Sequence, residues 1–282
     1  MSRLKKNTKP SSPKSLAATR GRWWGEFEIP AGSERRWQIE RSQLWLRRLP
    51  NEWWIARCWG DDNTPSAVEV AEATPIDDQA KVPDGADLRR VVFGQTDDTV
   101  EVRPALADRP VVTRPEVPLL IPSGEEVTFY AGTPLWLRVV LRRGTPPAVD
   151  EPLVAQPETW FGPSTLRGEL CYLSRTHAHV NLANLEVPAD RAITPVTVKN
   201  RATSSLRLER FKVPVPHFSL FEGEGNTLWT DPLIIERDDS GDLDIQLQPG
   251  APAQATATEP LSTPRERSER LRMGRALSSL FG

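Results

Sequence analysis

The chain has little cysteine, no long apolar run and no excess of one charge. Cys58 and Cys171 are the two cysteines among 282 residues, and two thiols so far apart in sequence do not form a disulfide framework. No segment approaches the ~18–20 apolar residues that a membrane-spanning helix needs. Residues 1–10 are basic and, unlike a secretory signal, are followed by no apolar core. These absences predict a cytoplasmic protein.

Charge and motifs narrow the function classes further. Lys and Arg number 36 and Asp and Glu number 38, a formal net charge of −2, which argues against a nucleic-acid-binding surface over the whole protein. The sequence lacks a Gly-rich phosphate loop, a dinucleotide fingerprint, a Cys-x-x-Cys pair and a Gly-x-Ser-x-Gly elbow. We therefore predict no enzymatic activity, no cofactor and no nucleic-acid partner.

Proline and tryptophan are abundant instead. The 27 Pro are spread along the chain. Because Pro is excluded from helix interiors and central strand positions, this spread favours many short strands joined by turns. Residues 43–48 and 53–59 flank a four-residue turn signal and predict a hairpin. The pattern indicates an all-β fold of one large or two small antiparallel β-sandwich units.

Composition divides the chain into six segments. We expect a disordered basic N-terminal tail, a first sandwich unit, a Pro-rich linker, a second sandwich unit, a flexible linker and a short amphipathic C-terminal helix. Their predicted bounds are, in that order, 1–21, 22–145, 146–158, 159–248, 249–264 and 265–282. Further strands are predicted at 135–141, 178–182, 233–237 and 243–247, and a long loop at 61–85.

The C-terminal segment combines an apolar stripe with Arg residues. An apolar stripe that follows a flexible linker has little core of its own, so we expect it to dock onto another protein. The predicted apolar anchors are Met273, Leu277, Leu280 and Phe281, and the predicted charged rim is Arg272 and Arg275. Packing on the protein's own body and contact with an anionic membrane surface are the alternatives.

The Trp-rich hairpin is a second candidate surface. It interleaves aromatic and Arg side chains, and the predicted interface residues are Trp45, Trp53, Trp54 and Arg57. Trp53 and Trp54 are adjacent, so in a strand one of them must face outward. Packing in the core and a carbohydrate-binding platform are the alternatives for these residues.

The segment 160–179 holds the candidates for a ligand or metal site. Cys171, His177 and His179 offer a thiol and two imidazoles, which suit zinc, although no further ligand stands at a diagnostic spacing. Alternation predicts that Thr176, Ala178 and Val180 face inward. The turn after Trp160 is either a binding loop or a corner where Trp160 and Phe161 fill the core.

Several short motifs together resemble a known prokaryotic family, the one labelled domain of unknown function 432. They are Arg22-Trp23-Trp24-Gly25, Trp37 with Leu44-Trp45-Leu46-Arg47-Arg48, Arg109-Pro110 with Arg114-Pro115-Glu116-Val117-Pro118, Trp160-Phe161-Gly162-Pro163-Ser164-Thr165 with Gly168-Glu169-Leu170-Cys171-Tyr172, and Val213-Pro214-Val215-Pro216-His217. The family has no assigned activity, so the resemblance implies no catalytic residue. It implies a non-secreted prokaryotic protein and, through gene neighbourhoods, a mechanosensitive-type membrane channel as a partner.

These observations favour a non-enzymatic interaction or scaffold protein. We expect it to dock onto a larger assembly through the C-terminal motif and the aromatic–Arg surface, as an accessory of a membrane channel, either in the cytoplasm or peripheral to the membrane. A ligand- or metal-binding β-sandwich domain with its site near 160–179, and a carbohydrate-binding module, are the two alternative functions.

Overall fold

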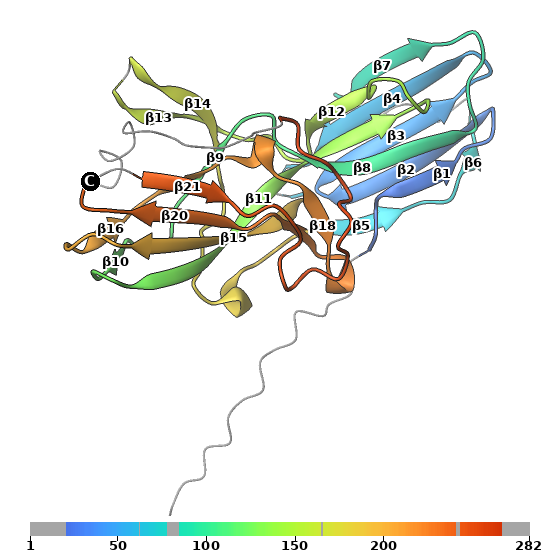
Figure 1. Cartoon of the computed structure of the whole chain (residues 1–282). Coiled ribbons are helices and arrows are strands. Elements are labelled where there is room, and N and C mark those ends of the chain that lie inside the picture. Colours follow the sequence, from blue (N-terminus) through green and yellow to red (C-terminus); the bar gives the residue numbers. More distant parts are fainter. Residues whose placement is uncertain (1–20, 62, 78–84, 165, 241–242, 267–282) are drawn as a thin grey trace, which may run out of the picture.

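The computed structural model describes residues 21–61, 63–77, 85–164, 166–240 and 243–266 (Figure 1). Strands dominate, and three short 3₁₀ turns accompany them: η1 (Leu182–Asn184), η2 (Val215–His217) and η3 (Glu224–Asn226). The predicted all-β class is therefore confirmed. In this part of the chain no helix is long and apolar enough to cross a membrane. Almost all of the predicted N-terminal tail, and the docking anchors at 272–281, lie outside the described residues.

A six-stranded sheet carries the Trp-rich hairpin. Gln43 pairs with Cys58 and Arg48 pairs with Trp53, so the predicted hairpin is confirmed. The segment 61–85, expected to be a long loop, contributes two short strands that pair with β2. The strands are β2 (Ser33–Glu40), β3 (Ser42–Arg48), β4 (Glu52–Trp59), β5 (Ala67–Val70), β6 (Thr74–Pro75) and β7 (Asp87–Val92), with β5-β2-β3-β4-β7 as the main order.

A nine-stranded sheet runs through the middle of the molecule. It is built around one long strand, β11 (Glu126–Val140). Residues 126–134 of β11 pair with β15, whereas residues 135–140 pair with β8. The predicted strands at 233–237 and 243–247 form an antiparallel pair, as expected. The other strands are β1 (Gly25–Glu28), β8 (Thr99–Leu106), β12 (Val149–Pro152), β15 (Arg191–Asn200), β18 (Leu220–Glu222), β19 (Leu228–Thr230), β20 (Leu233–Arg237) and β21 (Leu243–Leu247).

Two smaller sheets complete the fold. The four-stranded sheet has the order β13-β14-β9-β17, and its β13–β14 hairpin projects at the upper left of Figure 1. Most strand pairs are antiparallel, but β9 with β14, and β15 with both β19 and β20, are parallel. These strands are β9 (Val111–Thr113), β13 (Glu158–Ser164), β14 (Arg167–Leu173) and β17 (Phe211–Val213), and β10 (Leu119–Ile121) pairs with β16 (Leu206–Leu208).

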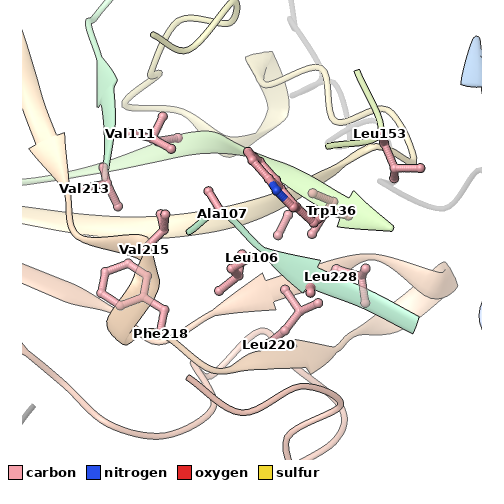
Figure 2. Packing of buried hydrophobic residues seen from close by; sticks show 14 of the residues in the cluster. Leu106, Ala107, Val111, Trp136, Leu153, Val213, Val215, Phe218, Leu220 and Leu228 are labelled. Carbon is pink, nitrogen blue, oxygen red and sulfur yellow. The ribbon is translucent and has the colours of Figure 1, made fainter. Parts of the chain in front are cut away.

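One large apolar core connects the sheets. Phe27 of β1 packs edge-on against Trp37 of β2, with ring centroids 5.2 Å apart, and Phe129 of β11 packs against Phe211 of β17. Figure 2 shows the middle of this cluster, where side chains from β8, β9, β11, β17, η2, β18 and β19 meet. The two halves of the chain therefore share a continuous core. A second, smaller cluster gathers around Trp229 and Phe221.

The observed pairing changes the predicted segment boundaries. Residues 146–158, expected to be a linker, contain β12, which pairs with β11, and Leu153, which is fully buried. Residues 249–264, expected to be a flexible linker, lie against the body, where Leu261 packs on the core and its N–H donates to the Leu220 carbonyl. The Pro-rich composition of both segments indicated linkers, but Pro also suits extended segments at sheet edges.

The predicted strand at 178–182 is also corrected. Only Ala178 and His179 form isolated bridges there, and η1 starts at Leu182. Ala178 is buried as expected, but Val180 is exposed, because regular alternation ends where the strand does.

Candidate interaction surface

Two of the four predicted interface residues on the Trp-rich hairpin are not accessible. Trp53 is fully buried in the core, so for this residue the core-packing alternative is correct. Arg57 is 5 % exposed and reaches across to β12, where it donates to Glu151 Oε2 at 2.7 Å and to the Pro152 carbonyl at 3.0 Å. Burial lowers the pKa of Arg57, whereas Glu151 acts to raise it. Arg57 therefore joins two sheets.

The other two residues, Trp45 and Trp54, lie on the outer face of the sheet and are partly exposed. The Arg90 guanidinium lies 5.1 Å from the centre of the Trp54 ring and covers part of it. Beside Trp45 is a groove of about 310 Å³, and its lining includes Gln38, Gln43 and Glu69. This face is therefore partly covered by its own polar side chains and has an open groove beside Trp45.

Cys171, His177 and His179 are not brought into a metal site. Within the described ranges, no three His, Cys, Asp or Glu side chains are close enough together to hold a metal ion. Cys171 is fully buried, and burial raises the pKa of its thiol to about 11. A neutral buried thiol is a poor metal ligand and a poor nucleophile.

Exposed apolar side chains gather on the β13–β14 hairpin instead. Trp160 is 44 % exposed, Leu170 is 41 % exposed and Leu166, near the tip, is 93 % exposed. Trp160 and Leu170 are directly paired across the two strands, so their side chains share one face. We call these three residues the hairpin surface. Apolar groups exposed together in this way are candidates for contact with another molecule.

The hairpin is held firmly in its shape. Trp160 Nε1 donates to the Ser164 carbonyl at 2.8 Å across a register shift between Phe161 and Ser164. At this point the two strands approach so closely that a Cβ on Gly162 would lie 2.1 Å from the Arg167 carbonyl oxygen. On the opposite face Phe161 and Cys171 are buried in the core. The hairpin surface is therefore presented on a rigid support.

Polar contacts fix the base of the hairpin. Tyr172 Oη donates to Asp108 Oδ1 at 3.0 Å, and Arg109 Nη1 donates to Glu158 Oε1 at 2.7 Å. Burial, followed by the bond to Asp108, raises the pKa of Tyr172 to about 12, so the phenol stays protonated. Tyr172 also packs on Trp136 of the main core, with ring centroids 5.2 Å apart. The hairpin is thus coupled to the segment that follows β8.

The free edge of β13 is less suited to binding than its face. β13 is the edge strand of its sheet, but the register shift interrupts its ladder and Pro163 has no N–H to donate. Pro and irregular pairing are devices that discourage strand addition at an edge. The edge of β13 is therefore poorly suited to pairing with a foreign strand.

Residues 23–280 match the family described as "Protein of unknown function (DUF432)". The chain belongs to this family. The match confirms the resemblance found in the short motifs and covers nearly all the described fold. No curated protein and no solved structure matches the chain.

The turn after Trp160 was predicted to be either a binding loop or a corner where Trp160 and Phe161 fill the core. The structure divides the two roles between neighbours, since Phe161 is buried and Trp160 is exposed. Adjacent residues of a strand face opposite sides, so this alternation was the available signal. Leu166 and Leu170 were missed because an isolated exposed Leu has no sequence signature.

Proposed function

We propose that this DUF432 protein is a non-catalytic interaction protein that docks onto a larger protein assembly. The hairpin surface and the C-terminal segment 265–282 are the proposed contacts. The observation that carries the proposal is the exposure of Trp160, Leu166 and Leu170 on a hairpin whose strands and indole are held by the contacts described above. Large apolar side chains on a rigid support give binding energy at little cost in conformational entropy.

The contact chemistry suggests the kind of partner surface. Tryptophan and leucine require an apolar pocket or groove on the partner, and the neighbouring Glu158 and Arg109 require a polar rim around it. The family resemblance makes a mechanosensitive-type membrane channel the first partner to test. We expect the complex to form in the cytoplasm or at a membrane surface.

Photo-crosslinking tests this proposal. A photoreactive residue at Leu166 of the full chain is exposed to native lysate that includes membranes, and the captured protein is then purified and tested for direct binding. We expect Trp160→Ser combined with Leu170→Ser to weaken that binding at least about tenfold. Val92→Ser is the control, because Val92 is an apolar side chain more exposed than Trp160 and Leu170 but lies on β7. Equal loss of binding in the control would refute the role of the hairpin surface.

The groove beside Trp45 supports a second candidate, saccharide binding. An indole edged by Gln38, Gln43 and Glu69 combines a stacking surface with planar hydrogen-bonding groups, a combination that suits a sugar ring. Titration with oligosaccharides should quench tryptophan fluorescence in the natural chain and not in Trp45→Ala. Identical titrations of the two proteins would exclude this groove as a saccharide site.

A further inference from the structure

The last described residues leave the body from a fixed point. Arg265 Nη1 donates to Asp150 Oδ2 at 2.7 Å, and Arg265 Nε donates to the Leu106 carbonyl at 2.7 Å. The next residue, Glu266, donates from its backbone N–H to the Pro216 carbonyl at 3.0 Å. Burial acts to raise the pKa of Asp150, but its hydrogen bonds from Arg265 and Arg138 hold that pKa below its usual value. The carboxylate that anchors Arg265 is therefore ionised at neutral pH.

This exit point lies next to the base of the hairpin. Leu106, which accepts from Arg265, is the last residue of β8, and the chain continues from it directly to Asp108 and Arg109. These two residues hold Tyr172 and Glu158, on the two strands of the hairpin. A continuous series of contacts thus connects the start of the C-terminal segment with the hairpin surface.

The C-terminal segment is long enough to reach that surface. Its apolar stripe starts at Met273, and the chain from Glu266 to Met273 can extend over at most ~25 Å. The stretch from Leu106 to Arg109 covers at most ~10 Å, and Trp160 lies two strand positions beyond Glu158, a further ~7 Å. The side chains of Arg265 and Arg109 span the two remaining steps of this route. The reach to Met273 is comparable with the length of this route, and the apolar stripe continues from there to Phe281.

The two surfaces are complementary in chemistry. The segment offers an apolar stripe edged by Arg272 and Arg275, and the hairpin offers exposed Trp160 and Leu170. At the base of the hairpin, the exposed carboxylates Asp108 and Glu158 share a single guanidinium, that of Arg109. Glu158 lies two positions from Trp160 on the same strand, so its half-exposed carboxylate is on the face of the apolar patch and can accept from an Arg of the segment.

We propose that the C-terminal segment 267–282 seats its apolar stripe on the hairpin surface of the same molecule. A short segment fixed next to its target has a high effective concentration there, so modest contacts suffice. The segment contains Gly274, so a short helix here would be marginal alone in water and would be stabilised by an apolar partner surface. The proposal concerns the free molecule and needs no external partner. Where the proposed function also holds, the segment and the partner compete for one surface.

The test places a photoreactive residue at Leu280 of the full chain and irradiates dilute purified protein. We expect crosslinks from this position to residues 158–173 within the monomer. Trp160→Ser combined with Leu170→Ser should reduce their yield at least about tenfold. Val92→Ser, which changes an exposed apolar side chain on β7, should leave the yield unchanged.

Because the Trp160 indole also bonds within the hairpin, a second variant separates docking from folding. Leu166→Ser removes a side chain that is almost fully exposed, and it should lower the yield several-fold while the melting temperature stays constant. Crosslinks to another part of the body, crosslinks only between two copies, or no crosslink in the folded protein would each overturn the proposal.

Discussion

At the residue scale, Arg57 is a charged side chain that links two sheets. It is buried on β4 and pairs with Glu151 of β12, so the ion pair links two sheets. A guanidinium in this position is stabilising only while its carboxylate is present, because an unpaired buried charge is costly. Its sequence context, among Trp residues, indicated a binding surface instead.

We predict that Glu151→Gln destabilises the protein by about 2 kcal/mol, since it leaves Arg57 buried without its counter-charge. The partial exposure of Glu151 keeps the cost below that of a fully buried pair. Urea unfolding measures the change. Arg143→Gln is the control, because Arg143 and its partner Glu26 are both well exposed, and it should change stability by less than about 0.5 kcal/mol. Similar losses in the two variants would contradict the structural role of Arg57.

The two thiols should differ in reactivity. Cys171 is fully buried and burial raises its pKa to about 11, whereas Cys58 is only half-buried. We predict that a thiol reagent at pH 8 modifies Cys58 in the folded protein and modifies Cys171 only after unfolding. Equal rates for the two cysteines in native protein would show that Cys171 is accessible.

The raised pKa of Cys171 makes the stability of the folded protein depend on pH. The pKa of Cys171 is higher in the folded state than the ~8.5 of an unfolded thiol, so its contribution is present below pH ~8.5 and is lost as the pH rises toward the folded value. We predict a fall in melting temperature between pH 8 and pH 10.5 that is smaller in Cys171→Ala. An identical pH dependence in that variant would assign the fall to other groups.

At the element scale, the β13–β14 hairpin depends on a close approach of its strands. Gly162 faces the backbone of Arg167 and Gly168, and a methyl group has no space there. Backbone atoms cannot move aside as a flexible side chain can, so the strands themselves would have to separate.

We predict that Gly162→Ala loosens the hairpin and costs about 2 kcal/mol or more. Hydrogen exchange of residues 158–173 should accelerate, while exchange in β3 and β4 stays unchanged. Gly94→Ala is the matched control, because a Cβ at Gly94 meets nothing within 4 Å. Unchanged exchange in the Gly162 variant would contradict the observed geometry of the turn.

At the scale of the whole molecule, β11 connects the two halves of the protein. One part of this strand pairs with β15 and the other with β8, and a single apolar core extends across both regions. Separating the two halves of the protein would therefore break this strand and expose the core between them.

We predict one cooperative thermal transition by calorimetry, with equal calorimetric and van't Hoff enthalpies. For the same reason a fragment covering 22–145 should not fold by itself, because it lacks β15 and β12. Two resolved transitions, or a folded fragment, would show that two independent domains exist after all.

The sequence by itself determined the class of fold and many of its parts. Evenly spread Pro and alternating apolar residues predicted short strands, and the hairpin at 43–59 and the pair at 233–247 were located because turn chemistry and period-2 alternation act locally. The family was recognisable as well, because short motifs survive as strings of neighbouring residues.

Only the tertiary structure decided which surfaces are open. The sequence does not distinguish the environments of Trp53, Trp160 and Arg57. In the structure Trp53 lies in the core, Trp160 faces solvent and Arg57 bridges two sheets. Which side of a strand is covered depends on pairings between residues far apart along the chain, such as β9 with β14. Local patterns do not record such pairings, and for this reason the linkers at 146–158 and 249–264 were expected to be free and are instead part of the packed body.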